Sequence, residues 1–185
     1  MNPGAVLPTA LLAWVLLVGA RPGPWTIERD ASTIVMSVNA FGLTSMGHFE
    51  DWGGDIAFDP DSPELSRATV IVQAASLRVR PAFATARATG PGFLDAARHP
   101  TIRFQLRALE PSGGERYSAR ADVTIKGTTR PVAFPVDLRT TGDRAQMTGG
   151  FTVDRAAFGI GTSGLWNNFV ARQVTVRVSL QARRD

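Results

Sequence analysis

Alternation of apolar and polar residues is the clearest pattern in this chain, and residues 131–138 show it well. Every second residue from Val132 to Leu138 is large and apolar, and the residues between them are Pro131, Ala133, Pro135 and Asp137. Because successive side chains of a strand point to opposite faces, this pattern predicts a strand with one apolar face and one mixed face. Proline has no N–H to donate, so the two prolines predict an edge strand, a bulge or a strand beside an open seam.

The residues just before this segment predict its partner strand. Residues 121–125 alternate in the same way, and the sequence KGTT follows them at positions 126–129. Two alternating runs joined by a short turn that contains glycine predict a β-hairpin.

Similar runs recur along the chain from Trp25 onward. The predicted strands are residues 32–39, 55–58, 68–74, 101–106, 117–126, 132–138, 145–153 and 174–180. About eight short strands, with turn residues between them and little room for long helices, predict an all-β protein built as an antiparallel sandwich or barrel.

Residues 80–100 interrupt this series of strands. The segment is too long for a hairpin loop, and its FLDAAR sequence at positions 93–98 predicts one or two helical turns that end before Pro100. Because inserted segments of this length often cap or line a site, Phe83, Phe93 and Leu94 are candidate residues of a lid or portal.

The first twenty residues differ from the rest of the chain. Residues 10–20 form an apolar run that ends in Val18-Gly19-Ala20, which fits the small-residue rule for signal-peptide cleavage. We therefore expect residues 1–20 to be a signal peptide and the protein to be periplasmic or secreted. An uncleaved membrane anchor remains an alternative, although the run is short for a membrane span. A single domain follows, from residue 25 to residue 182.

Composition excludes several classes of function. The 185 residues include no cysteine, so disulfides and thiolate metal sites are not available. The net charge is +4, but the arginines are scattered along the chain. A nucleic-acid-binding protein usually concentrates its cations, so we expect no nucleic-acid partner.

Motifs for catalysis or metal binding are weak. His48 and His99 are the only histidines, and neither has the spacing of a metal site, so no metal and no cofactor are predicted. No G-x-S-x-G nucleophile motif is present. Residues 159–164 match G-x-G-x-x-G, but a final strand follows them instead of the helix and second strand of a dinucleotide site. These glycines therefore predict a turn or a bulge.

Several short sequences, in their order and spacing, identify a family that the chain resembles. They are WTIERDASTI at 25–34, MGHF at 46–49, GDIAFDP at 54–60, AASL at 74–77, FLDAARHPTIRF at 93–104, TIKGTTRPV at 124–132 and FTVDRAAFGIG at 151–161. The chain from about residue 25 to residue 182 resembles the YceI-like proteins, which are bacterial periplasmic lipid-binding proteins. The family's Arg-Asp…His-Leu cluster is replaced here by residues 84–88 (ATARA), and Ala31 and Ala40 stand where family members often carry histidines.

The resemblance implies an extended, lipocalin-like antiparallel β-barrel with a short helical insertion. It also implies a lumen that holds an isoprenoid or quinone-like lipid, and an apolar face of residues 132–138 that lines this lumen. Parity and family likeness together give the candidate lumen residues, which are Ile34, Met36, Val38, Phe58, Phe104, Phe134, Val136 and Phe151.

These observations predict a non-enzymatic, exported carrier or sequestering protein that binds an isoprenoid-type or other amphiphilic lipid. Two alternatives remain at this point. One is a barrel enzyme with an acid–base pair inside the lumen, for example a carboxylate with His48 or His99. The other is a structural or interaction barrel with a filled core. The sequence leaves open a transient membrane contact and the oligomeric state, a dimer included.

Overall fold

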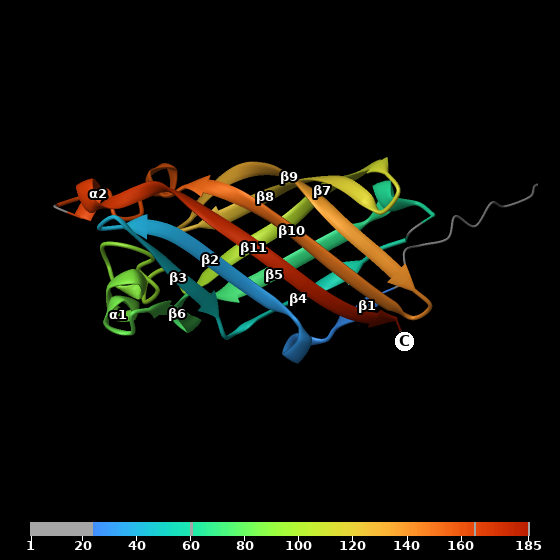
Figure 1. Cartoon of the computed structure of the whole chain (residues 1–185), viewed down its shortest axis with the longest axis horizontal. Helices are drawn as coiled ribbons and strands as arrows, with labels where there is room; N and C mark the ends of the chain where they lie inside the picture. The colour runs from blue at the N-terminus through green and yellow to red at the C-terminus, as the bar shows by residue number, and fades with distance from the viewer. Residues whose placement is uncertain (1–23, 60, 165, 185) are drawn as a thin grey trace, which may run out of the picture.

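The protein is an elongated β-barrel whose strands run obliquely along its length (Figure 1). The structure, a computed structural model, describes residues 24–59, 61–164 and 166–184. Its strands are β1 (Pro24–Ile27), β2 (Thr33–Ala40), β3 (Leu43–Phe49), β4 (Trp52–Ala57), β5 (Arg67–Gln73), β6 (Leu77–Arg80), β7 (Thr101–Gly113), β8 (Arg116–Ile125), β9 (Thr128–Thr141), β10 (Arg144–Asp154) and β11 (Val170–Arg184). The predicted signal peptide lies outside the described residues.

Eight antiparallel strand paths form the closed barrel. Three of these paths are interrupted, so that β1 continues into β2, β3 into β4, and β5 into β6. Both β1 and β2 pair with β11, on either side of the short helical turn η1 (Arg29–Ala31), and the pairing of β1 with β11 closes the sheet. The predicted all-β, lipocalin-like barrel of about eight strands is therefore confirmed.

Each of the eight predicted strands corresponds to an observed strand, but β1, β3 and β6 were not predicted. The pattern failed for β3 because Gly47 is the only fully buried residue of that strand. The side chains of Leu43 and Met46 are exposed, so no apolar alternation marks the strand in the sequence.

The hairpin and its prolines follow the prediction. Ile125 pairs with Thr128 across a two-residue turn, in which Lys126 and Gly127 both have positive φ. Strand β9 pairs with β8 over residues 128–137, but its pairing with β10 begins only at Val136. Pro131 and Pro135 fall in the part of β9 that has no β10 partner, so they lie beside the open seam that their missing N–H groups predicted. Both are exposed on the outer face of the strand.

The helical insertion is present but is displaced from its predicted position. The helix α1 (Phe83–Thr89) lies about ten residues before the expected residues 93–98 and contacts β6. Residues 93–98 instead form turns, in which the N–H of His99 donates to the carbonyl of Asp95. A second helix, α2 (Trp166–Phe169), lies at the same end of the barrel as α1 (Figure 1). Among the described residues, no helix is long and apolar enough to cross a membrane.

We expect Gly54→Ala to destabilise the barrel where β4 meets β5. A Cβ atom on Gly54 would lie 2.2 Å from the carbonyl oxygen of Thr69 and 2.9 Å from the Cα of Val70. Both are backbone atoms, so the strands must move apart, and the free energy of unfolding should fall by about 1–3 kcal/mol. Thermal unfolding measures the loss. Gly53→Ala is the matched control, because its Cβ would approach only the Arg29 guanidinium, at 3.9 Å. Equal stability of the two variants would contradict the prediction.

Candidate functional site

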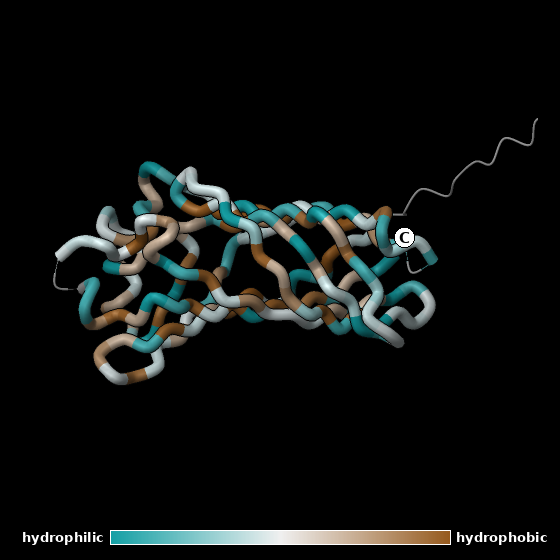
Figure 2. The backbone as a smooth tube through the Cα atoms, turned by 90° about the horizontal axis from the view of Figure 1, so that it is seen from above, coloured by the Kyte–Doolittle hydropathy of each residue, from teal (hydrophilic) through white to brown (hydrophobic). Residues whose placement is uncertain are grey.

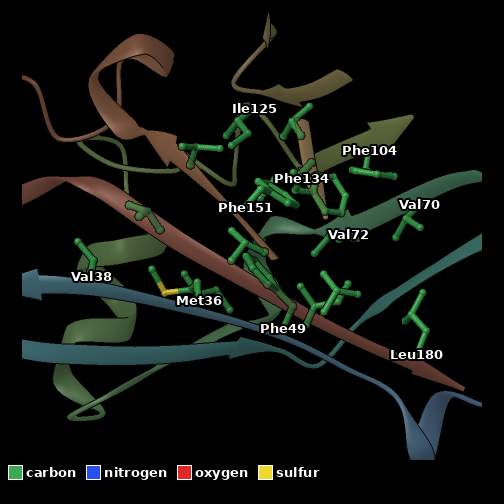
Figure 3. A pocket seen from close by; sticks show the side chains of 18 of the residues that line it. Met36, Val38, Phe49, Val70, Val72, Phe104, Ile125, Phe134, Phe151 and Leu180 are labelled. Atoms are coloured by element: carbon green, nitrogen blue, oxygen red, sulfur yellow. The ribbon is translucent and has the colours of Figure 1, made fainter. Parts of the chain in front are cut away.

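A large apolar cavity occupies the interior of the barrel. Its volume is about 930 Å³, and the inward-facing residues of the strands line it (Figure 3). Hydropathy along the backbone alternates between brown and teal on these strands, as the period of two requires (Figure 2). An eight-stranded barrel can either fill its interior with side chains or leave room for one ligand, and this barrel leaves room.

All eight residues predicted to face the lumen line this cavity. They are Ile34, Met36, Val38, Phe58, Phe104, Phe134, Val136 and Phe151. Contact of these residues with a ligand stays a prediction. Sequence reasoning missed most of the other lining residues, among them Phe49, Val70, Val72, Ile125 and Leu180 (Figure 3). The alternation within 68–74 and 174–180 marked Val70, Val72 and Leu180 as apolar positions of a strand. It did not show which face of these two strands points into the lumen.

Three phenylalanines form the aromatic part of the wall. The ring of Phe134 lies 5.1 Å from that of Phe151 and 6.2 Å from that of Phe104, measured between centroids. Gly149 makes room for this group, because a Cβ at that position would lie 3.2 Å from the Phe134 ring. The three rings come from β7, β9 and β10, so they pack against one another on the lumen side of three strands near the open seam.

Buried aromatic residues close the barrel at the end formed by β1 and the C-terminal part of β11. The indole N–H of Trp25 donates to the carbonyl of Phe58 at 2.9 Å, and the ring of Tyr117 meets that of Phe58 edge to face at 6.2 Å. The guanidinium of Arg184 lies 4.6 Å from the centre of the Trp25 ring on the outside. Phe58, a predicted lumen residue, therefore belongs to this end wall.

The opposite end carries α1 and the β2–β3 turn, and here exposed side chains line the cavity. The predicted lid or portal residues Phe83, Phe93 and Leu94 all contribute to the lining. Leu94 is buried, Phe93 is half-buried against Gly161, and Phe83 is 84% exposed. Their place at this end fits a portal, and the portal role itself stays a prediction.

A buried arginine holds the loops of this end together. Arg155 is only 2% exposed, and its guanidinium donates five hydrogen bonds of 2.5–3.2 Å. The acceptors are the backbone carbonyls of Ile160, Gly161, Asn167, Val170 and Ala171. Burial lowers the pKa of Arg155 from its ordinary value, and the negative charge of Asp154 partly opposes this shift. The sequence offered no signal for this role, since the five acceptors lie 5–16 residues away.

The neighbouring Asp154 has a different set of partners. Its carboxylate accepts the N–H of Ala156 at 2.9 Å, which caps the short helix η4 (Arg155–Phe158), and it pairs with Arg172. The hydrogen bond from Arg172 lowers the pKa of Asp154 below its ordinary value. The pair lies on the outside of the barrel, so it does not provide a charged group within the cavity.

Groups for acid–base chemistry do not meet inside the barrel. Within the part of the chain that the structure describes, no carboxylate and no histidine lines the cavity. The imidazole of His48 is half-exposed, and its Nε2 lies 3.9 Å from Glu50 outside the lumen. The described residues also contain no group of three or more side chains that could hold a metal ion. The lumen residues alone therefore offer apolar contact and few polar groups.

Comparison with known proteins gives matches along most of the chain. A family model described as the YceI-like domain matches residues 25–182. The UPF0312 protein of Pseudomonas savastanoi pv. phaseolicola is 30% identical over 120 residues, which is 62% of this chain and 62% of that protein. The UPF0312 protein of Pseudomonas fluorescens is 31% identical over 123 residues, covering 66% of this chain and 62% of that protein. The chain thus aligns with less than two thirds of the length of these relatives.

Solved structures of low sequence identity share the fold. The crystal structure of Burkholderia cenocepacia BcnA superposes with a TM-score of 0.79 at 24% identity, covering 84% of this chain and 98% of that one. A polyisoprenoid binding domain from Saccharophagus degradans, implicated in plant cell wall breakdown, superposes with a TM-score of 0.68 at 12% identity. That match covers 87% of this chain and 98% of the domain.

Proposed function

The chain belongs to the YceI-like family, and we propose that it is a non-enzymatic carrier or sequestering protein for an isoprenoid-type or other amphiphilic lipid. One observation carries the proposal: the apolar cavity of about 930 Å³ along the barrel interior. The solved domain from Saccharophagus degradans, described as polyisoprenoid binding, supports the same class of ligand.

The chemistry of the lining favours a long hydrocarbon tail. Burying each methylene group contributes about 0.8 kcal/mol, so affinity in such a lumen grows with the length of the tail. The few polar side chains in the lining include Thr44, Ser45, Arg80 and Arg87 toward the α1 end and Ser66 and Arg67 toward the other. A polyprenyl or quinone-like lipid would place its tail along the barrel and its head group at the α1 end, where the cavity meets solvent.

Two other functions fit the structure less well. A filled-core barrel is incompatible with an interior cavity of this size. An enzyme would need an acid–base pair in the lumen, and the described lining residues include neither a carboxylate nor a histidine.

Export is a separate part of the proposal. The apolar run at residues 10–20 and the small residues that end it support a signal peptide, and hence a periplasmic or secreted protein. Transport of lipid between membranes would require this location.

Mass spectrometry of the lipid that copurifies with the protein tests the function. We expect organic extracts of the protein, purified from its own host, to contain about one isoprenoid-type lipid per chain, because the apolar lumen would retain a long tail through purification. The same protein is then stripped of lipid and offered polyprenyl and quinone lipids in detergent. An empty extract, together with no uptake in the second assay, would contradict the proposal.

A further inference from the structure

Large apolar side chains are exposed around the α1 end of the barrel. Phe41 at the β2–β3 turn is 56% exposed, Leu43 is 74% exposed, and Phe169 at the end of α2 is 50% exposed. Phe83, the first residue of α1, is the most exposed of the group. We call these four residues the apolar rim. Contiguous exposed apolar residues on a soluble protein usually mark an interaction surface.

Several contacts place the segments of this rim together. The rings of Phe41 and Phe169 stack at 5.2 Å, and the N–H of Phe41 donates to the carbonyl of Phe169 at 2.8 Å. The N–H of Gly161 donates to the carbonyl of Gly92 at 2.8 Å, which ties the loop before α2 to the segment after α1. Phe41, Leu43 and Phe83 also line the cavity, so three of the four rim residues lie at its solvent-facing end.

The conformation of Phe41 is costly for an exposed aromatic residue. Its φ is +53°, and the following Gly42 has a φ of +77°, as in the two-residue hairpin turns that favour Asn, Asp or Gly at both positions. A bulky residue in this region is strained, so stability of the turn does not explain the phenylalanine. The ring instead stacks on Phe169 and is still 56% exposed, so it is available to a partner at the surface.

The charge of this end is strongly positive. Residues 40–46, 80–100, 125–130 and 154–172 contain seven cations and only two carboxylates, which gives this end a net charge of +5. The whole sequence carries +4, so the remainder is close to neutral. Both carboxylates are paired, Asp95 with Arg98 and Asp154 with Arg172. Arg80 and Arg87 lie beside the apolar rim in the cavity lining.

We propose that the apolar rim and its arginines dock on the surface of a bilayer that contains anionic phospholipids. Aromatic and aliphatic side chains enter the interfacial region of a membrane, while neighbouring arginines meet the lipid phosphates. This arrangement would face the open end of the cavity toward the lipid, so that a tail could pass between the bilayer and the lumen without crossing water. The proposal goes beyond the lipid carrier function and concerns a different partner, the membrane surface.

Sedimentation with vesicles tests the docking surface. We expect the full chain to bind vesicles of phosphatidylcholine with about 30% phosphatidylglycerol and to bind pure phosphatidylcholine far less, because anionic lipid supplies the attraction for Arg80 and Arg87. The double variant Arg80→Gln/Arg87→Gln should bind these vesicles at least about tenfold more weakly. Raised salt should also weaken binding of the unmodified chain, because it screens the same attraction. Phe41→Asn with Leu43→Ser should also lower binding about tenfold, and asparagine suits the backbone of residue 41.

Leu65→Ser is the matched control. Leu65 is a 42% exposed leucine of the β4–β5 connection, outside the apolar rim and outside the cavity lining, and its loss should leave vesicle binding unchanged. Equal binding by the rim variants and the unmodified chain would overturn the proposal, as would an equal loss in Leu65→Ser. Absence of vesicle binding by the unmodified chain would also overturn it and would direct attention to a protein partner for the rim.

Different experiments test the docking proposal and the carrier function, so either one can be contradicted without the other. Uptake of polyprenyl lipid from detergent by the unmodified chain needs no bilayer, so it tests only the lumen. Vesicle binding that depends on the rim, with an empty extract and no uptake from detergent, would retain the docking surface and reject the carrier. Uptake from detergent without vesicle binding would retain the carrier function and reject the docking surface.

Discussion

Replacement of Arg155 by methionine is expected to lower the free energy of unfolding by about 3–5 kcal/mol. Methionine keeps much of the apolar stem but leaves five backbone carbonyls without the donors that Arg155 supplies. Each unsatisfied buried polar group costs about 1–3 kcal/mol, and relaxation of the loop toward water recovers part of that loss. For a chain of this size the melting temperature should fall by about 6–20 °C, which differential scanning calorimetry would measure.

The neighbouring pair supplies a control for this variant. Arg172→Met removes the partner of Asp154 on the outer surface, where solvent screens the interaction, and should change the melting temperature little at neutral pH. Because the folded-state pKa of Asp154 is lowered, the stabilisation from this pair is present above the ordinary carboxyl pKa. This stabilisation is lost as the pH falls through the folded-state pKa of Asp154. The melting temperatures of Arg172→Met and the unmodified chain should therefore converge in acid. A melting temperature for Arg155→Met as high as that of Arg172→Met would contradict the structural role of Arg155.

Most of the barrel strands could be predicted from the sequence, but strand β3 and the position of the helix could not. The barrel strands were recognised from their period of two, because each is long enough to bury every second residue against one lumen. Strand β3 lacks that signal because its apolar side chains are exposed. The helix was expected at FLDAAR, but Leu94, Asp95 and Ala96 are buried in turns under the end of the barrel, and FATARAT forms the helix instead. Tertiary burial decided both cases, and no local propensity reports it.

The candidate site was predictable in one respect and not in another. Parity together with the family resemblance placed Phe134 and Val136 inward and Pro135 outward, and in the structure the first two are buried and Pro135 is exposed. Whether the inward side chains meet at the centre or leave a cavity depends on the width of the barrel and on small residues such as Gly149, Ala119 and Ala121 between the large ones. Those distances are set by contacts across the whole sheet. The cavity therefore had to be seen in the structure.

We expect Phe134→Glu to abolish retention of an isoprenoid-type lipid. Phe134 is buried in the aromatic part of the wall, with Phe151 and Phe104 around it, and Gly149 beneath its ring. Loss of the ring costs about 3–5 kcal/mol of stability by itself, and a carboxylate in this apolar lining must also lose its hydration. Lipid copurification and uptake from detergent measure the first effect, and thermal unfolding measures the second.

The adjacent residue gives a matched control for this variant. Ala133 is exposed on the outer face of β9, opposite Arg120 of β8, which already pairs with Glu110, so a glutamate at position 133 stays in solvent beside a cation and should leave lipid uptake unchanged. The two variants add the same charge to neighbouring positions of one strand, on opposite faces, and only Phe134→Glu also removes a ring. If Ala133→Glu lost uptake while Phe134→Glu retained it, the assigned face of β9 would be wrong.

A variant that narrows the lumen separates ligand binding from folding, since Phe134→Glu can lose both together. Val38 lies in the cavity lining on β2, toward the α1 end (Figure 3). Tryptophan at this position adds apolar volume to space that is otherwise open, so it should preserve the melting temperature. It should also weaken lipid uptake by about tenfold or more, because the ring displaces part of the lipid tail. Loss of about two buried methylene groups of the tail costs about 1.4 kcal/mol or more, which is a factor of about ten in affinity. Preserved stability with full uptake would place the ligand outside this part of the lumen. Lost uptake in a stable Val38→Trp protein, by contrast, would show that the lipid occupies or passes through this part of the cavity.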